Sequence, residues 1–343
     1  MKDLRDYSLL PHNTFGIDAR CRRFLEIETD EEALRLPSLL TASDSPLLII
    51  GGGSNLLLTK DFNGTVLRSA IRGIKAKAQD DDSVLLRVGS GETWDDIVAL
   101  CVDKGWFGAE NLSLIPGDVG ATAVQNIGAY GAEASHIIYH VEAVEISTGE
   151  LVTIAASDCG YGYRMSRFKQ EWRGRFLITH VTFRLQTTFT PQLDYGNIRS
   201  VLQQRGIEKP TASELRQAII DIRREKLPDP LVEGNAGSFF MNPVVSRERF
   251  EELLSKYPQM PYYPVVNEAS EHCCYKIPAS WLIEQCGWKG RSLGHAGVHS
   301  RQALVLVNRG GATGADIVAL CDAIRHDVKD KFDIDIVPEV NIV

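Results

Sequence analysis

The chain has 343 residues, of which 44% are hydrophobic and 24% charged, as in an ordinary globular protein with a sizeable core. Its formal charge of −8 argues against a nucleic-acid partner, so an anionic ligand must be held by local arginine and lysine clusters. No apolar run approaches the roughly 18 to 20 residues of a membrane span, and "MKDLRDYSLLPHNTF" lacks the apolar centre of a secretion signal. We therefore expect a cytoplasmic protein with no membrane contact and no obligate protein partner.

The first hundred residues contain clear signals for helices and strands. "TDEEALRLPSLL" opens with a capping-box pattern at Thr29 and predicts a short helix, and "SPLLII" predicts a buried strand that stops at Gly51. The Asn-Gly pair at residues 63–64, between apolar runs, predicts a hairpin turn. "SVLLRVGSG" predicts another strand, and a helix follows from Thr93 to Gly105.

The middle of the chain continues this mixture. Residues 115–131, "IPGDVGATAVQNIGAYG", are rich in small residues, show little periodicity and are not expected to form a core. "HVEAVEISTGELVTI" predicts a hairpin around Thr148-Gly149, and "RFLITHVTFRLQ" predicts a further strand. "TASELRQAIIDIRREK" predicts a helix capped at Thr211.

The segment "KLPDPLVEGNAG" is rich in proline and glycine and predicts a domain boundary. Beyond it we expect helices at "SRERFEELLSKY", "PASWLIEQCGW" and "GADIVALCDAIRHDVKDKF", a strand at "QALVLVN", and a final strand over the last twelve residues. Because no regular alternation of strand and helix is present, the fold class is α+β.

Two segments have the composition of ligand-binding loops. The consecutive glycines of "LLIIGGGSNLLL" follow a predicted strand and can point several backbone N–H groups at one anion, although an ordinary glycine-rich turn would use the same residues. Neither a dinucleotide fingerprint of the Rossmann kind nor a Gly-Lys-Ser/Thr phosphate loop is present. Residues 115–131 would let backbone approach a large flat ligand closely.

Together the two segments indicate a dinucleotide with a pyrophosphate, such as FAD. The residues expected to bind it are Gly51, Gly52, Gly53, Ser54, Asn55, Pro116, Gly117, Gly120, Thr122, Gln125, Asn126 and Gly128.

Three further features suggest chemistry, each with a plainer interpretation. Arg164, Arg167 and Lys169 in "GYGYRMSRFK" form an anion site or a solvated basic patch. His295 and His299 are four residues apart, but they lack a third ligand, so we expect no metal site there. The adjacent Cys273 and Cys274 also lack metal-ligand spacing.

Ser238 in "GNAGSFFMNP" lies between small residues and two phenylalanines. It is either a reactive hydroxyl in a pocket that the aromatic rings keep dry or a turn residue at the start of a buried strand. In the last predicted strand, Glu339 falls on the polar face opposite Phe332, Ile334 and Ile336, where it is either a cleft residue or a solvated one.

Six motifs, "GGGSN", "IPGDVGATAVQNIGAYG", "GYRMSRFK", "KLPDP", "GNAGSFFMNP" and the final "PEV", occur in this order. In this the chain resembles the UDP-N-acetylenolpyruvoylglucosamine reductase family from about Asn13 to the C-terminus. "YPQMPYYP" resembles the form of the family that closes a tyrosine over its substrate.

The resemblance implies a vanillyl-alcohol-oxidase/p-cresol-methylhydroxylase-type FAD-binding fold in two subdomains, plus an α+β substrate-binding domain. Residues 1–70, completed by a C-terminal strand at 331–343, would form the first FAD-binding subdomain. Residues 71–225 would form the second, and residues 226–330 the substrate-binding domain.

The resemblance also implies roles for individual residues. Ser238 would be the proton donor, with Arg164 and Glu339 as catalytic partners. The residues implied to contact the UDP-sugar are Tyr130, Tyr195, Lys226, Asn242, Tyr263 and Gln302.

The implied reaction is the NADPH-dependent, FAD-mediated reduction of UDP-N-acetylglucosamine enolpyruvate to UDP-N-acetylmuramate in peptidoglycan synthesis, and hence in cell wall formation and cell division. Arg164 suits the substrate carboxylate because a guanidinium stays charged and can bind it through two hydrogen bonds. Glu339 would act as a general acid or stabilise the intermediate. The alternatives are an FAD oxidase of the same fold acting on an alcohol or phenol, and a silent nucleotide-sugar-binding protein.

Overall fold

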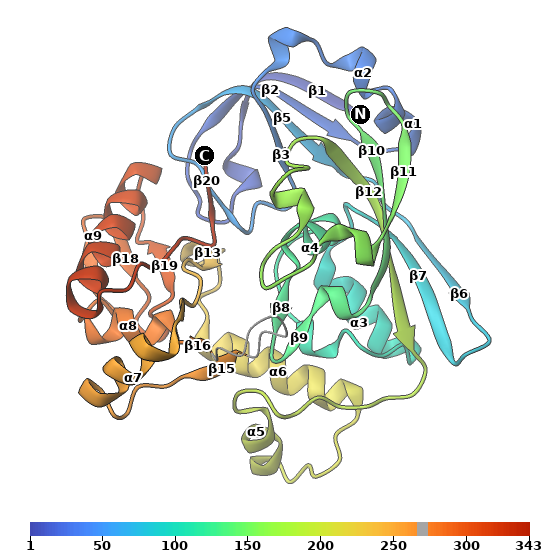
Figure 1. Cartoon of the computed structure of the whole chain (residues 1–343). Helices are drawn as coiled ribbons and strands as arrows, with labels where there is room; N and C mark the ends of the chain where they lie inside the picture. Colours follow the sequence, from blue (N-terminus) through green and yellow to red (C-terminus); the bar gives the residue numbers. More distant parts are fainter. Residues whose placement is uncertain (266–273) are drawn as a thin grey trace. The chain divides into compact units, whose positions relative to one another are not determined.

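We analysed a computed structural model of the chain, which describes residues 1–265 and 274–343. The chain divides into two compact units, each described below by itself (Figure 1). Unit 1 comprises Met1–Tyr7, Cys21–Gly52 and Phe62–Glu225, and unit 2 comprises Ser8–Arg20, Gly53–Asp61 and Lys226–Val343. Both contain helices and strands in irregular order, which confirms the predicted α+β class.

Unit 1 carries most of the long strands. They are β1 (Lys2–Ser8), β2 (Arg20–Ile27), β3 (Leu47–Ile50), β5 (Phe62–Ser69), β6 (Ile74–Ala78), β7 (Ser83–Gly89), β8 (Gly128–Ala129), β9 (Ala132–Glu133), β10 (Ile138–Glu145), β11 (Leu151–Ala155) and β12 (Phe176–Gln186). Its helices are α1 (Asp30–Leu34), α2 (Leu36–Leu39), α3 (Trp94–Lys104), α4 (Val119–Gln125), α5 (Ile198–Gln204) and α6 (Ala212–Lys226).

Two sheets organise unit 1. The first has the strand order β1-β2-β5-β3, in which β2, β5 and β3 are parallel. The second has the order β11-β10-β12-β7-β6, and its neighbouring strands are antiparallel. Strand β5 is therefore central in the first sheet, and the carboxyl end of β3 leads directly into Gly51.

Apolar side chains from both sheets bury one another. One cluster joins Leu25 and Leu67 of the first sheet to Val144 and Leu177 of the second. A larger cluster packs the second sheet against α3 and α4, with Trp94 among its largest buried side chains. The ligand-binding loops predicted from the sequence thus begin at the edges of a well-packed scaffold.

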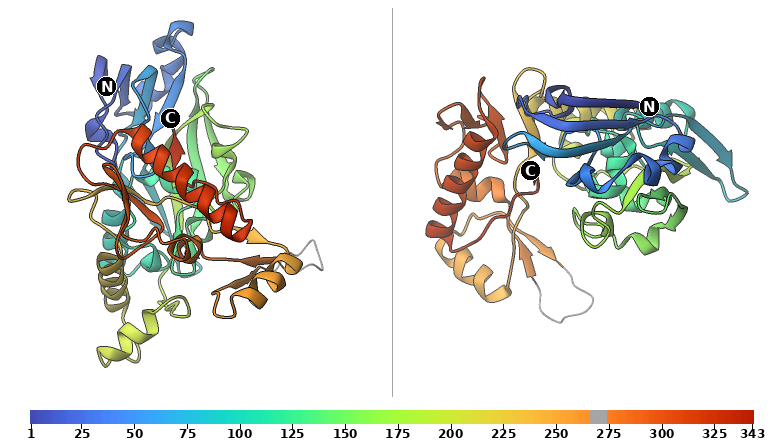
Figure 2. Two further views of the ribbon diagram at one scale, coloured as in Figure 1. Left: turned by 90° about the vertical axis from the view of Figure 1, so that its left-hand side faces the viewer. Right: turned by 90° about the horizontal axis from the view of Figure 1, so that it is seen from above.

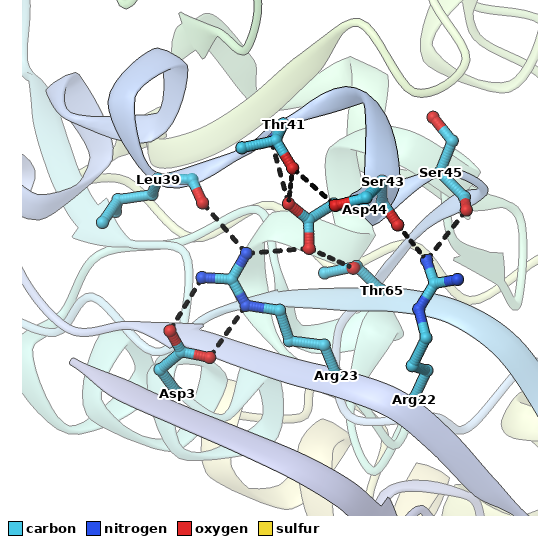
Figure 3. A network of polar contacts seen from close by, with 9 residues as sticks. All are labelled: Asp3, Arg22, Arg23, Leu39, Thr41, Ser43, Asp44, Ser45 and Thr65. Atoms are coloured by element: carbon cyan, nitrogen blue, oxygen red, sulfur yellow. Dashed lines mark hydrogen bonds and ion pairs between the residues drawn. The ribbon is translucent and has the colours of Figure 1, made fainter.

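A buried ion-pair network positions the segment that leads into β3 (Figure 3). Arg23 on β2 donates to both carboxylate oxygens of Asp3, at 2.8 and 2.7 Å, and to Asp44 Oδ1 at 2.9 Å. It also donates to the Leu39 carbonyl oxygen at 2.9 Å. Burial raises the pKa of Asp44, but hydrogen bonds from Thr41 and Arg23 outweigh it and hold that pKa well below its usual value.

Unit 2 contains shorter strands. They are β4 (Leu56–Leu57), β13 (Gly234–Ser238), β14 (Val244–Val245), β15 (Tyr263–Val265), β16 (Cys274–Lys276), β17 (Ser292–Leu293), β18 (Ala296–Val298), β19 (Val305–Asn308) and β20 (Asn341–Ile342). Its helices are α7 (Arg247–Lys256), α8 (Ala279–Gln285) and α9 (Gly314–Phe332).

The sheets of unit 2 follow the orders β13-β19-β18-β17 and β14-β16-β15, and β20 pairs in parallel with β4. The long helix α9 contacts strands β17, β18 and β19 (Figure 2). Its buried face includes Ile317, Leu320 and Ile324. This packing gives β13, at the edge of the first of these sheets, a rigid support.

Many predicted elements are confirmed, chiefly those with local signals. Thr29 Oγ1 accepts from the Glu32 amide at the start of α1, and Thr211 and Glu214 form the reciprocal cap of α6. Gly105 ends α3 in the left-handed conformation, with φ of 70°. The hairpin around Thr148-Gly149 is the antiparallel pair β10–β11.

The predicted hairpin turn at residues 63–64 is wrong. Both residues lie inside β5, and the preceding strand β4 belongs to a different sheet. A Cβ built on Gly64 would lie 2.2 Å from the carbonyl oxygen of Pro46. The glycine therefore serves a close approach between β5 and the start of β3, and not a turn.

The prediction of a strand over the last twelve residues is largely wrong, but the predicted alternation of buried and exposed side chains is present. Only Asn341–Ile342 form a strand, and Asp333 ends α9 in the left-handed conformation with φ of 49°. Ile334 and Ile336 are nevertheless buried, while Asp333 and Asp335 are exposed. The alternation of side chains persists without regular strand pairing.

Candidate active site

The two glycine-rich segments meet within unit 1. A Cβ built on Gly51 would lie 3.3 Å from the Ala121 Cβ. One built on Gly52 would lie 3.1 Å from Asp118 Oδ1 and 3.3 Å from the Gly117 Cα. Side chains at these glycines would push the segments apart, so the absence of a Cβ permits their close approach.

The second segment is partly helical, which corrects the expectation that it would lack a helix and contribute no core. Val119–Gln125 form α4, with Val119 and Ala123 fully buried in the larger core cluster of unit 1. The helix ends at Asn126, which has φ of 46°. Helix α4 therefore anchors this segment to the scaffold.

Several expected FAD-binding side chains on this segment bond to the protein itself. Thr122 Oγ1 donates to the Val119 carbonyl oxygen at 2.6 Å, and Gln125 Oε1 accepts from Lys169 Nζ at 2.7 Å. Asn126 Nδ2 donates to Glu133 Oε2 at 2.8 Å and to the Gly162 carbonyl oxygen at 2.9 Å. Pro116 and Gly117 come directly before the helix cap Asp118, and the Gly120 amide donates to the Ser90 carbonyl oxygen at 2.9 Å.

Arg164 is attached to the end of the same segment. Its guanidinium donates to the carbonyl oxygens of Gly128 and Asn126, the latter at 3.4 Å. A Cβ on Gly128 would lie 2.6 Å from Arg164 Nη1 and 2.9 Å from the Ala132 carbonyl oxygen, so a side chain there would displace the guanidinium and press on the backbone. Arg164 itself has φ of 56°, a left-handed conformation that is uncommon for a residue other than glycine and that is often found at functional sites.

Tyr130 and Tyr195 are also brought together in unit 1. A Cβ built on Gly196 would lie 3.8 Å from Tyr130 Cδ1, and one on Gly131 would lie 3.3 Å from the Tyr195 Cβ. Burial raises the pKa of the Tyr130 phenol, although the neighbouring Arg223 acts in the opposite direction. Tyr195 is about half exposed.

Arg223, on α6, is a residue that the sequence analysis missed. Burial lowers the pKa of its guanidinium, and Arg164 adds to that effect, while Tyr130 and Asp95 oppose it. Its Nε donates to the Leu114 carbonyl oxygen at 3.3 Å. A half-buried arginine that interacts unfavourably with Arg164 creates a positive environment beside Tyr130, suited to an anion.

In unit 2, Gly53–Asn55 are bonded to the segments that carry Ser238 and Glu339. The Thr14 amide donates to the Gly53 carbonyl oxygen at 3.2 Å, while Thr14 Oγ1 donates to the carbonyl oxygen of Asn235 on β13 at 2.6 Å. Asn55 Nδ2 donates to the Glu339 carbonyl oxygen at 3.4 Å. Ser54 lies between these two anchored residues.

Ser238 is the last residue of β13 and pairs with Val305 of β19. Its side chain is exposed, whereas Phe239 and Phe240 are 0% and 1% exposed. Phe239 packs edge-on against Phe15 and Phe240, with ring centroids 6.2 and 5.2 Å apart. The two rings belong to the core of unit 2, directly behind the exposed serine.

Glu339 lies directly beside this strand end. Its amide donates to the Phe239 carbonyl oxygen at 2.8 Å, and Phe240 forms an isolated bridge with Pro338. The backbones of Ser238 and Glu339 are therefore held in adjacent, hydrogen-bonded segments, although the residues are about a hundred positions apart in sequence.

The remaining candidates of unit 2 are more dispersed. Lys226 ends α6, and Asn242 Oδ1 accepts from the Ala279 amide at 2.9 Å at the start of α8. Tyr263 begins β15 and is about half exposed. Gln302 Oε1 accepts from the Leu304 amide at 3.3 Å, and Gln302 lies three residues before Val305, where the partner strand of Ser238 begins.

Within residues 1–265 and 274–343, no group of three or more His, Cys, Asp and Glu side chains is arranged to hold a metal ion. Cys274 is a free thiol, and Cys273 lies outside the described residues. Among the described helices, none is long and apolar enough to cross a membrane.

Comparison with known proteins identifies the family. Residues 229–343 match the C-terminal domain of UDP-N-acetylenolpyruvoylglucosamine reductase, and residues 22–155 match an FAD binding domain. The reductase of Bacteroides fragilis is 53% identical over 340 residues, which are 98% of this chain and 99% of that protein. The chain belongs to the UDP-N-acetylenolpyruvoylglucosamine reductase family.

Two further relatives agree with this assignment. The reductase of Burkholderia ambifaria is 47% identical over 98% of this chain and 95% of its own length. The crystal structure of UDP-N-acetylenolpyruvylglucosamine reductase from Thermus caldophilus covers 99% of this chain and 98% of its own, with a TM-score of 0.67 at 22% identity. That likeness supports the fold, namely an FAD-binding domain of the predicted type followed by the family's C-terminal domain.

Membership in this family makes the chain a flavin-dependent oxidoreductase of peptidoglycan precursor synthesis, with FAD as cofactor and NADPH as hydride donor. The alternatives of an alcohol or phenol oxidase and of a silent binding protein are thereby set aside. The glycine segments fit the cofactor, because the lack of side chains at Gly51 and Gly52 lets the backbones of the two segments approach each other closely and the fold holds both segments together.

Proposed function

We propose that this chain reduces UDP-N-acetylglucosamine enolpyruvate to UDP-N-acetylmuramate. The observation that carries the proposal is 53% identity to a family member across 98% of the chain. The same proposal assigns FAD to the two glycine-rich segments and the UDP-sugar to Tyr130, Tyr195, Lys226, Asn242, Tyr263 and Gln302. We further propose that the protein acts in the cytoplasm without an obligate protein partner.

When bound, FAD would carry the hydride from NADPH to the terminal vinyl carbon of the substrate. The protein's own task is to stabilise the negative charge that then develops on the neighbouring carbon and its carboxylate. Arg164 is suited to this, because its bonds to the carbonyl oxygens of Gly128 and Asn126 orient the guanidinium before substrate binds. A preorganised cation stabilises the transition state without first having to reorient.

Ser238 would give the proton that completes the reduction. Its position at the end of β13, fixed by pairing with Val305 and by the buried rings that follow it, supports this role, because a donor on a rigid strand approaches one face of the substrate only. Glu339 would assist as a general acid or by stabilising the intermediate. The bond between the Glu339 amide and the Phe239 carbonyl oxygen supports a joint action of the two residues.

We also propose the domain organisation that the resemblance implies, with subdomains at 1–70 and 71–225 and a substrate-binding domain at 226–330. Unit 2 takes over from unit 1 at Lys226, which supports the last boundary. The parallel pairing of β20 with β4 supports the return of the C-terminal segment, residues 331–343, to the N-terminal part of the sequence. The tyrosine-loop form is proposed on "YPQMPYYP", and Arg223 is proposed as an additional anion-binding residue.

Separate measurement of the two half-reactions tests the proposal. The purified protein should be yellow and should release intact FAD on denaturation. Under anaerobic conditions NADPH should bleach the flavin, and UDP-N-acetylglucosamine enolpyruvate should restore its colour. A protein that cannot be reconstituted with FAD would refute the proposal.

Ser238→Ala isolates the proton transfer. Bleaching by NADPH needs no proton from this serine and should proceed at nearly the normal rate. Return of the colour should slow by about 10²- to 10⁴-fold, the usual contribution of general acid catalysis. Ser238→Cys should recover part of that rate, since a thiol can also donate. Equal slowing of both half-reactions in Ser238→Ala would make the serine a packing residue and direct attention to Glu339.

A further inference from the structure

Arg68 lies at a distinctive position in the first sheet of unit 1. It is near the carboxyl end of the central strand β5, where it is paired with Glu26 on β2 and with Ile50 on β3. Ile50 is the residue directly before Gly51. The parallel register therefore places Arg68 beside the strand end from which the first glycine segment emerges.

The guanidinium of Arg68 links two carboxylates. Its Nη1 donates to Glu26 Oε2 at 2.7 Å, and its Nη2 donates to Asp118 Oδ2 at 3.0 Å. Glu26 is also bonded to Lys2 Nζ, at 2.5 Å. The side chains of Arg68 and Asp118 are 17% and 13% exposed, so solvent screens this pair poorly.

Asp118 occupies the space between the two glycine segments. It stands at the N-cap position of α4 in the second segment, without a side-chain bond to the helix, and its Oδ1 lies 3.1 Å from the position of a Cβ on Gly52 in the first. A negatively charged carboxylate at this point would repel the diphosphate of FAD, because like charges repel strongly in a poorly solvated region. Burial raises the pKa of Asp118, whereas Arg68 and Arg72 act in the opposite direction and Glu26 adds to the increase.

We propose that Arg68 is a positioning residue for the flavin site: it neutralises the Asp118 carboxylate and turns it toward β5, so that the two glycine segments can accept an anionic diphosphate. This inference rests on the proposed assignment of those segments to FAD. Lys2 and Glu26 complete the arrangement, since Glu26 shares its charge between two cations and orients Arg68 from the neighbouring strand.

A direct role for Arg68 on the diphosphate is the main alternative. Its buried Nε has no hydrogen-bond partner among the described residues, so one donor is left for another acceptor. The two roles differ in their dependence on Asp118. A neutralising Arg68 becomes dispensable once Asp118 loses its charge, whereas an Arg68 that binds the diphosphate itself does not.

The test measures FAD binding by calorimetric titration of the FAD-free full-length protein with FAD. In Arg68→Met the dissociation constant should rise by about 10- to 100-fold, the range seen when residues that orient metal ligands are removed. Asp118→Asn alone should bind FAD at least as tightly as the unaltered protein. The double variant Arg68→Met/Asp118→Asn should recover most of the loss, because the two changes act through one interaction.

The pH dependence of binding gives a second readout. In Arg68→Met the carboxylate of Asp118 loses its hydrogen-bonded cation, while Arg72 and Glu26 still act on it, so FAD should bind more tightly as the pH falls and Asp118 becomes protonated. The double variant should lack this dependence. If the dependence persists in the double variant, Glu26 and not Asp118 is the group that Arg68 neutralises, and the proposal is overturned.

Arg87→Met serves as the matched control. Arg87 also forms a two-bond pair in unit 1, with Glu142 at 2.7 and 2.6 Å. It contacts His180 and Asp30 as well, and none of these three residues lies in the glycine segments. Urea unfolding of each FAD-free variant shows whether it is folded. An equal loss of FAD affinity in Arg87→Met and Arg68→Met, or no recovery in the double variant, would overturn the proposal.

These outcomes are distinct from failure of the proposed function. If the unaltered protein binds no FAD, the glycine segments have been assigned wrongly. If the unaltered protein binds FAD and Arg68→Met binds it equally well, only the role of Arg68 is refuted.

Discussion

Gly53→Ala should lower the free energy of unfolding, because the structure leaves no room for a side chain at this position. Gly53 has φ of 70°, and a Cβ built on it would lie 1.9 Å from the His12 carbonyl oxygen. An L-residue in the left-handed conformation costs roughly 1–2 kcal/mol. Forcing backbone apart in a packed region costs about 1–3 kcal/mol more, so the free energy of unfolding should fall by about 2–5 kcal/mol.

Gly16→Ala separates the two contributions. Gly16 lies in the same unit and has φ of 66°. A Cβ built on it would have no neighbouring atom within 4 Å. It therefore carries the conformational cost without the clash, and any effect of alanine on the unfolded chain is common to both variants. The difference between them should be about 1–3 kcal/mol and should report the clash with the backbone of His12 and Asn13.

The assay is urea unfolding of the FAD-free protein followed by far-ultraviolet circular dichroism, with the slope of each transition compared. Equal destabilisation by Gly53→Ala and Gly16→Ala would refute the reasoning, because it would mean that the turn at residues 12–14 moves away without cost. The Thr14 amide, which donates to the Gly53 carbonyl oxygen at 3.2 Å, argues against such movement.

Two further predictions concern the substrate and the pH. Tyr263→Phe should weaken UDP-sugar binding while leaving flavin reduction by NADPH close to normal; equal loss in both half-reactions, measured by stopped flow, would show that the loop is merely structural. The pKa of Asp44 is held below its usual value in the folded protein, so its ionised form stabilises the fold above the unfolded pKa of about 3.9 and that stabilisation is lost as the pH falls further. The stability difference between the unaltered protein and Asp44→Asn, measured by urea unfolding, should therefore be constant near neutrality and shrink in acid, and a difference that grows in acid would contradict it.

Elements with local signals could be predicted from the sequence. In the capping motifs at Thr29 and Thr211, the threonine and its hydrogen-bond partner are only three residues apart, so the whole interaction is visible in the local sequence. The turn at Thr148-Gly149 likewise needs only its neighbouring strands. The six motifs that occur in a fixed order along most of the chain also indicated the family, because together they are distinctive.

Features that depend on distant segments could not be predicted. Gly64 follows an asparagine and has the pattern of a turn, but the carbonyl oxygen of Pro46, on a parallel neighbour, requires glycine there. Arg68 has no local motif at all. Its partners Glu26 and Asp118 are 42 and 50 residues away, and only the parallel register of β2, β5 and β3 brings them together.

The motif "GGGSN" shows how sequence and structure differ in what they reveal. In sequence it is one short segment with one expected ligand, whereas in the structure Gly52 belongs to unit 1 and Gly53 to unit 2. Gly52 is constrained by Gly117 and Asp118 of the second glycine segment, and Gly53 by His12 and the turn that holds β13. The following residues, Leu56–Leu57, pair with β20 and not with the strand that comes next in the chain. Adjacent glycines of one motif thus meet separate steric demands, one beside the second glycine segment and the other beside the turn that holds the strand of Ser238.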